Sequence, residues 1–357
     1  MTCRFGGEHA LYRSAARSFD GLALSAAQAG LLAVFSDAAG LFVEALDAQG
    51  RARGSQLRIG ARCGGGLAAL WQREQLQVAC LRPSVASEPL KPAVTLYTLG
   101  ADVHVTAEQH FGVARRLSQG VALAADAHGL HCAWQDASVG ESRVWVATLT
   151  AGSATPAVLS DPAYRAGSPS LCEHRGAVVA AWAELQPQAV APVGRVMARA
   201  LAGDAAAVMV TSVRDAVSSP SVVSVAGQLV VAFRDRRSRG RKTGLYLLRL
   251  DDGLGPVGRA VRVARADGVA QPSVQACAGA IIAATPRTFA GDYFVGVVQV
   301  AAKLDRMSGE QQFYEDSHEF AQAAAACTPG GALLLIAERG MLGRPGAALR
   351  SVPFGCR

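Results

Sequence analysis

The chain has 357 residues, half of them hydrophobic, and its 35 lysines and arginines exceed its 28 aspartates and glutamates, which gives a formal net charge of +7. No apolar run approaches the roughly 20 residues that cross a membrane. The segment 1–17 carries charges without the apolar core of a signal peptide. We therefore expect one soluble domain over residues 1–357, with no membrane span, in the cytoplasm; secretion is the alternative.

The cysteines and histidines predict no metal or cofactor site. The eight cysteines show neither CxxC pairs nor the Cys/His spacing of a zinc site. Cys80 and Cys132 lie inside apolar runs, where a thiol packs as a small hydrophobe. His128 and His131, three residues apart, are interpreted as structural. No phosphate-binding loop, acyl-hydrolase elbow or HExxH motif is present.

In chain order, a predicted strand over residues 10–14 is followed by seven periods. In each period an apolar run ends in a charged side chain. These runs cover residues 31–37, 76–82, 130–136, 178–184, 229–235, 281–287 and 333–339. Their last residues lie 45 to 54 positions apart, a period typical of propellers and solenoids.

The fifth period shows the repeated pattern most clearly. Ser219-Pro220-Ser221 opens a strand, and residues 229–233 form a second, near-continuous apolar strand that we expect to be buried on both faces. Residues 245–250 form a third strand and residues 259–263 a weaker fourth. Four short strands per period are typical of a propeller blade, whereas a helical solenoid would need apolar residues at helical spacing. The sequence therefore predicts an all-β, seven-bladed β-propeller, with six blades as the alternative count.

The predicted blades cover residues 18–60, 64–107, 118–160, 167–211, 218–263, 270–313 and 320–357. The last of them lacks a fourth strand. We expect residues 10–14 to complete that blade and close the ring, which would also hide an unpaired sheet edge. This closure would bring Cys3 near Cys356; two free thiols near frayed ends are the alternative.

Arginines recur on one predicted face of the ring. Because strand direction alternates, the loops that enter the first strands and those that leave the second strands lie on the same side. The candidate ligand-binding residues are Arg82, Arg165, Arg214, Arg234, Arg236, Arg237, Arg265, Arg287 and Arg339. Guanidinium groups present paired donors to a carboxylate or phosphate, so this face would suit an anionic ligand. The alternative is that these arginines and the acids among them bridge neighbouring blades.

Several features resemble the sialidase-like, BNR-type propeller superfamily. They are the Ser-Pro-Ser strand openings, the second strands that end in Asp or Arg, and the run Phe233-Arg234-Asp235-Arg236-Arg237. The resemblance covers nearly the whole chain and implies a propeller. Sialidases of this superfamily share an Arg-Ile-Pro motif, three substrate-binding arginines, a tyrosine nucleophile paired with a glutamate, an aspartate acid/base and Asp-box turns. Here Tyr12-Arg13 precedes Ser14-Ala15, and Asp251-Asp252-Gly253 lacks the Ser and Trp of an Asp box.

We therefore expect a non-catalytic, monomeric binding propeller for an acidic glycan, an acidic small molecule or an acidic protein segment. The alternative is a sialidase-like exo-glycosidase, because glycoside hydrolysis needs an acid and a nucleophile or base on either side of the scissile bond. The catalytic candidates for that alternative are Asp37, Asp136, Tyr314 and Glu315. Aromatic residues make up 6% of the chain and offer little for base stacking, so nucleic acid is disfavoured as a partner.

Overall fold

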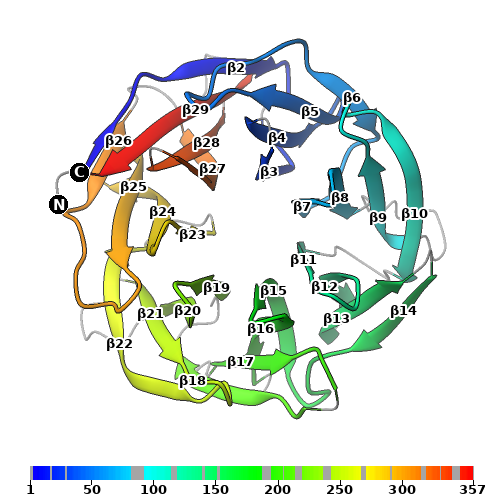
Figure 1. Cartoon of the computed structure of the whole chain (residues 1–357), viewed down its shortest axis with the longest axis vertical. Coiled ribbons are helices and arrows are strands. Elements are labelled where there is room, and N and C mark those ends of the chain that lie inside the picture. Colours follow the sequence, from blue (N-terminus) through cyan, green and yellow to red (C-terminus); the bar gives the residue numbers. More distant parts are fainter. Residues whose placement is uncertain are drawn as a thin grey trace.

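The computed structural model describes residues 3–16, 18–28, 30–81, 92–113, 119–138, 141–150, 153–186, 194–203, 205–213, 219–235, 243–266, 271–289, 292–314, 319–329, 331–339 and 346–356. Over these ranges the chain is all-β and forms seven antiparallel sheets arranged as a ring (Figure 1). This confirms the predicted seven-bladed β-propeller. Within the same ranges, no helix is long and apolar enough to cross a membrane.

Each blade runs outward from the axis as an inner, a second, a third and an outer strand. Blades 1 to 3 comprise β3 (Gly21–Ala27), β4 (Gly30–Asp37), β5 (Gly40–Leu46) and β6 (Leu57–Gly60); β7 (Leu67–Gln72), β8 (Gln75–Leu81), β9 (Pro92–Leu99) and β10 (Val105–Val113); and β11 (Gln119–Ala125), β12 (Leu130–Ser138), β13 (Glu141–Thr150) and β14 (Ser153–Val158). Blades 4 to 6 comprise β15 (Arg165–His174), β16 (Ala177–Leu185), β17 (Gly194–Ala200) and β18 (Val208–Val213); β19 (Ser221–Val225), β20 (Gln228–Asp235), β21 (Gly244–Leu250) and β22 (Pro256–Arg265); and β23 (Ser273–Cys277), β24 (Ala280–Phe289), β25 (Asp292–Ala301) and β26 (Gln311–Tyr314).

Blade 7 joins the two ends of the chain. Its inner, second and third strands are β27 (Glu319–Thr328), β28 (Gly331–Arg339) and β29 (Ala347–Cys356). The free edge of β29 pairs with β1 (Cys3–Phe5) and β2 (His9–Ser14) from the start of the chain. A disulfide links Cys3 to Cys356, so both the predicted closing strand and the predicted contact are confirmed.

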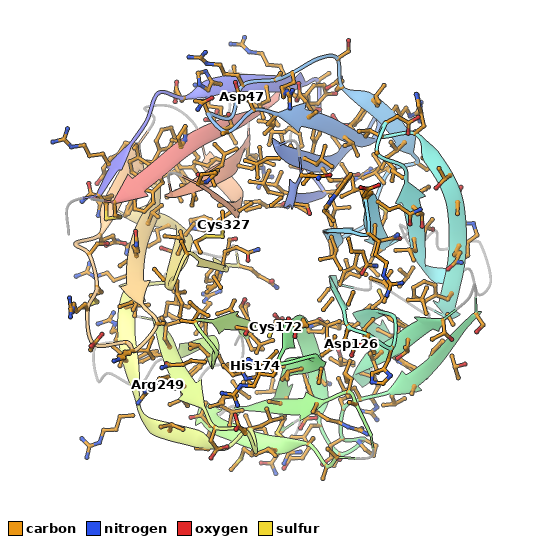
Figure 2. All side chains as sticks on the ribbon, in the orientation of Figure 1. Asp47, Asp126, Cys172, His174, Arg249 and Cys327 are labelled. Carbon is orange, nitrogen blue, oxygen red and sulfur yellow. A yellow bond between two sulfur atoms is a disulfide. The ribbon has the colours of Figure 1, made fainter. Side chains whose placement is uncertain are left out.

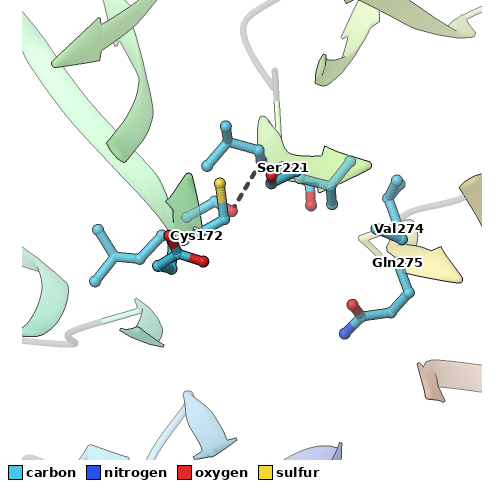
Figure 3. A pocket seen from close by; sticks show the side chains of 11 residues that line it. Cys172, Ser221, Val274 and Gln275 are labelled. Carbon is cyan, nitrogen blue, oxygen red and sulfur yellow. Dashed lines mark hydrogen bonds between the residues drawn. The ribbon is translucent and has the colours of Figure 1, made fainter. Parts of the chain in front are cut away.

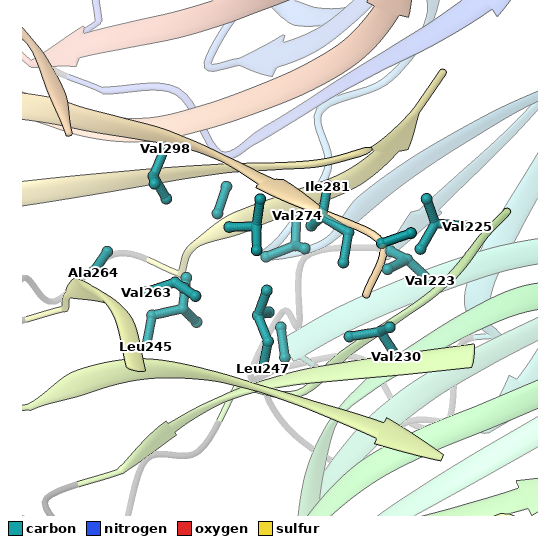
Figure 4. Close-up of a cluster of buried hydrophobic side chains, with 14 of the residues drawn as sticks. Val223, Val225, Val230, Leu245, Leu247, Val263, Ala264, Val274, Ile281 and Val298 are labelled. Carbon is teal, nitrogen blue, oxygen red and sulfur yellow. The ribbon is translucent and has the colours of Figure 1, made fainter. Parts of the chain in front are cut away.

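The second strands are buried on both faces because they face both neighbouring blades. In β20, Val230 and Ala232 pack with blade 6, in a cluster that includes Val274 and Ile281 (Figure 4). Residues of the other parity, such as Val231, pack with blade 4 instead. Alternation of side chains along a strand therefore makes one apolar run serve two interblade cores.

The serine that ends Ser168-Pro169-Ser170 in blade 4, and the serine that ends Gln271-Pro272-Ser273 in blade 6, each connect their blade to the next. The Ser170 hydroxyl accepts a hydrogen bond from the Val222 N–H of blade 5, at 3.0 Å. The Ser273 hydroxyl accepts from the Ala325 N–H of blade 7, at 3.1 Å. The repeated serine thus satisfies a backbone donor that the neighbouring inner strand leaves unpaired within its own blade.

Cysteine chemistry differs from the expectation in one respect. Cys80 forms a disulfide with Cys63 at the start of blade 2, so its interpretation as a free apolar thiol was wrong. A third disulfide, Cys277–Cys327, joins the inner strands of blades 6 and 7. Cys132 is a buried free thiol as expected, and burial raises its pKa.

Strand register corrects the alignment of the seventh period by one residue. Gly331 pairs with Thr328 at the hairpin of blade 7, as Gly30 pairs with Ala27 in blade 1. Counting from these glycines, the residue equivalent to Asp37 is Glu338, and not its neighbour Arg339. The apolar run in β28 conceals the shift because alternate leucines face opposite blades.

Candidate ligand-binding face

The ring has two faces that differ in their connections. We call the side where inner strands begin and second strands end the loop face, and the side where inner strands turn into second strands the hairpin face. The recurrent arginines and acids of the sequence belong to the loop face. Of the candidates, Arg82, Arg214, Arg236, Arg237 and Glu315 lie outside the described residues.

Five second strands end in an acidic residue that is buried. In blade order these residues are Asp37, Asp136, Glu184, Asp235 and Glu338, and each is at most 8% exposed. A buried carboxylate is costly unless hydrogen bonds or ion pairs satisfy it. The contacts of three of them show how the fold meets this requirement.

Asp37 anchors the chain's N-terminal strand to blade 1. Its carboxylate accepts hydrogen bonds from the Tyr12 hydroxyl, at 3.1 Å, and from the Ser14 hydroxyl. It also accepts one from the Ala39 N–H at 2.8 Å. Burial and the hydrogen bond to Asp37 raise the pKa of Tyr12. Tyr12 and Asp37 therefore have a structural role in ring closure.

Glu184 is the centre of a polar cluster between blades 3 and 4. Its Oε1 accepts from Trp182 Nε1 and from the Asp161 N–H, at 2.8 and 2.9 Å, and its Oε2 accepts from Arg195 Nε at 2.7 Å. Arg195 also pairs with Asp161 at 2.9 Å and lies 3.6 Å over the Tyr164 ring. Hydrogen bonding from the Ala163 N–H, and then from Arg195, lowers the pKa of Asp161.

Glu338 has an equivalent arrangement in blade 7. Arg350 Nε lies 2.7 Å from Glu338 Oε1, and Arg350 Nη1 lies 2.7 Å from Glu8 Oε1. As in the Glu184 cluster, one arginine on the third strand connects a buried carboxylate with a more exposed one. Arg195, Arg350 and Glu338 were not among the residues predicted from the sequence. A charge inside an otherwise apolar third strand was the signal that could have identified the two arginines.

Two of the predicted ligand-binding arginines are buried between blades 5 and 6. Arg234 and Arg287 are each 7% exposed. Arg234 Nη2 donates to the Ala266 carbonyl at 3.0 Å, and Arg287 Nη1 donates to Glu310 at 2.6 Å. Arg287 also lies 4.7 Å from the centre of the Phe294 ring. These contacts lie within each arginine's own blade. Arg287 Nη1 also donates to the Arg265 carbonyl of blade 5 at 3.5 Å, which fits the interblade role that the sequence left open as the alternative.

Other arginines of the loop face are exposed. Arg165 and Arg265, at the ends of β15 and β22, and Arg339, at the end of β28, are all in the exposed class. Arg62 is 53% exposed at its side chain and pairs across blades with Asp20 at 2.6 Å. These positions therefore expose guanidinium groups, whereas the second strands end mostly in buried acids.

The remaining catalytic candidates do not form a tyrosine–carboxylate pair in the described residues. Tyr314 is 55% exposed, and its hydroxyl donates to Gln312. Asp136 is 8% exposed and lies opposite Arg143 in the strand pairing. Arg143 in turn donates to the Tyr164 carbonyl at 2.8 Å. Arg195 contacts both Tyr164 and Glu184, and three N–H donors already hydrogen-bond the Glu184 oxygens, so Tyr164 and Glu184 do not form such a pair.

On the hairpin face, His131 is a structural residue as predicted. Its ring nitrogens lie 3.1 Å from Asp126 Oδ1 and 3.1 Å from the Thr148 hydroxyl. Asp126, labelled in Figure 2, also accepts from the Val178 N–H of blade 4. Burial opposes ionisation of Asp126, but the hydrogen bonds from His131 and His128 outweigh it and lower the pKa. In the described part of the chain, no group of three or more His, Cys, Asp or Glu could hold a metal ion.

A cavity of 270 Å³ lies along the inner strands of blades 4, 5 and 6 (Figure 3). Ser221, Gln275 and the free thiol Cys172 line it, together with Glu173 and with serine and aliphatic side chains. Burial raises the pKa of Cys172 to about 12, so the thiol is protonated at neutral pH. No arginine, lysine or histidine is among the described residues that line this cavity, which leaves the loop face as the candidate site for an anion.

Fold and site together define the chain as a seven-bladed propeller whose loop face carries exposed arginines above buried carboxylates. No protein-family model and no curated protein sequence matches it. Among solved structures, the polysaccharide lyase Uly1 is similar with a TM-score of 0.57 and 10% identity, over 92% of this chain and 89% of that one. Trypanosoma rangeli sialidase is similar with a TM-score of 0.52 and 10% identity, over 84% of this chain and 56% of that one. At this identity the likeness shows the fold, and it confirms the sialidase-like fold resemblance.

Proposed function

We propose that the loop face binds an acidic glycan without catalysing a reaction on it. The observation that carries the proposal is the separation of charge by depth: the second-strand acids are buried, whereas Arg165, Arg265 and Arg339 are exposed. An approaching ligand therefore meets guanidinium groups first. The acidic groups of a glycan supply the planar, charged acceptors that guanidinium groups bind best.

The state of the buried carboxylates supports a binding role over catalysis. A general acid, base or nucleophile must reach the bond that it acts on. The Glu184 oxygens are occupied by Trp182, Asp161 and Arg195, and Asp37 accepts from Tyr12, Ser14 and Ala39. Both carboxylates are committed to the fold, which also explains why acids recur at this repeat position.

The test is binding to heparin, a polyuronate and a sialylated oligosaccharide, each measured by calorimetry over a range of salt concentrations. We expect affinity for at least one of them to fall with rising salt. Arg165→Ala and Arg265→Ala should each weaken binding about ten-fold, as expected for a lost charge-assisted hydrogen bond. Arg259→Ala, an exposed arginine on the outer strand β22, is the matched control and should bind normally.

Absent or salt-independent binding across this panel would reject the proposal. Binding only to an acidic peptide would redirect it to an acidic protein segment. The sialidase alternative is favoured by the fold and by the exposure of Tyr314. It predicts release of a fluorophore from sialosides that is abolished by Tyr314→Phe or Asp136→Asn.

We also propose that the protein works in an oxidising compartment, in place of the cytoplasm that the sequence favoured. Three disulfides support this, because such bonds persist where thiols are not kept reduced. Thiol titration of the native protein from its own source should then find Cys132 and Cys172 reduced and the other six cysteines oxidised. Eight reactive thiols in the denatured protein would reject the proposal.

A further inference from the structure

A groove of 410 Å³ lies on the hairpin face between blades 2 and 3. Its volume is within the range of about 300 to 1,000 Å³ that small-ligand sites occupy. The polar side chains that line it include Gln72, Gln75, Gln77, Thr98, Gln109 and Thr150. Arg73 and His128 also line it, and none of the described lining residues is an aspartate or glutamate. Most of the polar side chains in the lining are therefore neutral amides and hydroxyls.

Gln77 breaks the repeat at a buried position. Strand pairing aligns it with Leu32, Val179, Val230, Ile282 and Leu333 of five other blades, and with His131 of blade 3. The five aliphatic side chains are buried against the next blade, whereas blade 2 places a primary amide there and blade 3 an imidazole. Burying an amide in place of an aliphatic group is unfavourable unless the amide makes hydrogen bonds.

The hydrogen bonds of Gln77 are only partly made within the protein. The residue is 6% exposed, and its Oε1 accepts from the Thr98 hydroxyl at 2.9 Å. Its amide nitrogen has no hydrogen-bond partner among the described residues. Since Gln77 lines the groove, this donor is directed to whatever occupies the groove.

The hairpin that borders the groove also departs from the other blades. Arg73 and Glu74 both have left-handed backbone, with φ of 47° and 61°. Three other blades place a glycine at the second position of this turn: Gly176, Gly227 and Gly279. A left-handed conformation is unfavourable for residues with a Cβ, and such departures concentrate where a protein binds a ligand. The turn positions Arg73 and Gln75 on the groove wall.

We propose that this groove binds a neutral saccharide. A primary amide both donates and accepts hydrogen bonds, as a sugar hydroxyl does, so the glutamines match a surface rich in hydroxyls. Leu96, Leu130 and Leu149 also line the groove and offer an apolar surface to the C–H face of a sugar ring. The absence of carboxylates in the lining removes the usual partner of a cationic ligand. The inference is independent of the loop face, which lies on the other side of the ring.

The test is binding of neutral oligosaccharides built from glucose, mannose or xylose, measured by ligand-observed NMR and calorimetry. We expect at least one of them to bind with an affinity that does not change with salt. Gln77→Leu introduces the aliphatic residue type found in other blades. It should weaken binding about ten-fold, because the ligand loses one buried hydrogen bond while the side chain keeps a similar volume. Gln49→Ala, an exposed glutamine of blade 1, is the control and should bind like the wild type.

Failure of all three oligosaccharide classes to bind the wild-type protein would overturn the inference. So would binding that Gln77→Leu leaves unchanged in a folded variant. If that variant does not fold, Gln109→Ala on the half-buried wall gives the same measurement. Arg165→Ala should leave neutral-sugar binding intact, so failure at one face can be distinguished from failure at the other.

Discussion

The boundary between blades 3 and 4 and the boundary between blades 6 and 7 are built by different chemistry. At the first, Glu184, Arg195 and Asp161 form ion pairs at the loop face, and Asp126 with His131 forms a polar contact at the hairpin face. At the second, an aliphatic and aromatic core is crossed by the Cys277–Cys327 disulfide. A repeated backbone therefore does not require a repeated interface. One boundary depends on ionisation, and the other on the oxidation state of its cysteines.

Removing the Cys277–Cys327 disulfide at the boundary between blades 6 and 7 should have the largest effect on stability. Replacing both Cys277 and Cys327 with serine removes a crosslink between residues 50 positions apart. Because the crosslink restricts the unfolded chain, we expect a loss of about 4 kcal/mol in the free energy of unfolding, measured in urea. Cys172→Ser, which alters a free thiol, should cost much less. Equal stability of the double variant and the wild type under oxidising conditions would contradict the disulfide.

Removing the Glu184 carboxylate at the boundary between blades 3 and 4 should lower the free energy of unfolding slightly less. Glu184→Ala leaves Arg195 without its buried partner and Trp182 Nε1 without its acceptor. Removing one member of a buried ion pair destabilises by about 3 kcal/mol, and urea unfolding would measure the loss. Asp305→Ala, at an exposed carboxylate between β25 and β26, is the control and should stay within about 0.5 kcal/mol of the wild type.

A third boundary, between blades 7 and 1, contains a buried carboxylate that has, in the described part of the chain, no ion-pair partner like that of Glu184. Glu44 is 5% exposed, and no described residue donates a hydrogen bond to its buried Oε2. Burial raises its pKa from 4.5 to about 7. The folded protein therefore holds the proton more tightly than the unfolded chain, and stability contributed at low pH is lost as pH rises from about 4.5 to about 7.

Glu44→Gln should remove that pH dependence. Urea unfolding at a series of pH values should show that the free energy of unfolding of the wild type falls by about 2 kcal/mol relative to that of the variant as the pH rises from about 4.5 to about 7. Glu184→Gln is the comparison variant, because the Glu184 carboxylate already accepts hydrogen bonds from Arg195 and two N–H donors. Parallel pH profiles for wild type and Glu44→Gln would contradict the assignment.

The smallest expected effect concerns the strand that closes the ring. Tyr12→Phe removes one hydrogen bond to Asp37 and keeps the ring that packs on Phe35. The expected cost is about 1 kcal/mol, detected as a lower Tm. Tyr314→Phe, at an exposed tyrosine, should leave Tm nearly unchanged. A larger effect of Tyr314→Phe would mean that the exposed tyrosine has a stabilising role that its contacts do not show.

Fold and closure could be predicted from the sequence because both depend on local apolar patterns. A second strand packed between two blades must be apolar at nearly every position, so its repeat is visible without any contact information. The one-residue shift at Glu338 was hidden for the same reason, since a continuous run of leucines and alanines does not mark which residues face which blade.

The candidate site was harder to predict because its residues differ from the other arginines only in how deeply their side chains are buried. Arg234 and Arg165 both belong to the recurrent arginines, yet one is buried against a carbonyl and the other is exposed. Strand periodicity places such residues on a face without saying whether the side chain turns into a boundary or out to solvent. Ring closure predicted the Cys3–Cys356 contact, but the Cys63–Cys80 and Cys277–Cys327 pairings were out of reach for a combinatorial reason, since eight cysteines allow about 105 complete pairings.

Ring closure through Cys3 and Cys356 brings both ends of the chain to one place on the outer rim (Figure 1). A tether attached at either end would therefore hold the ring by its edge, with both flat sides turned toward the surroundings. A single proteolytic cut in any surface loop would also leave one covalent molecule, because the bond between the first and last strands keeps the two pieces joined.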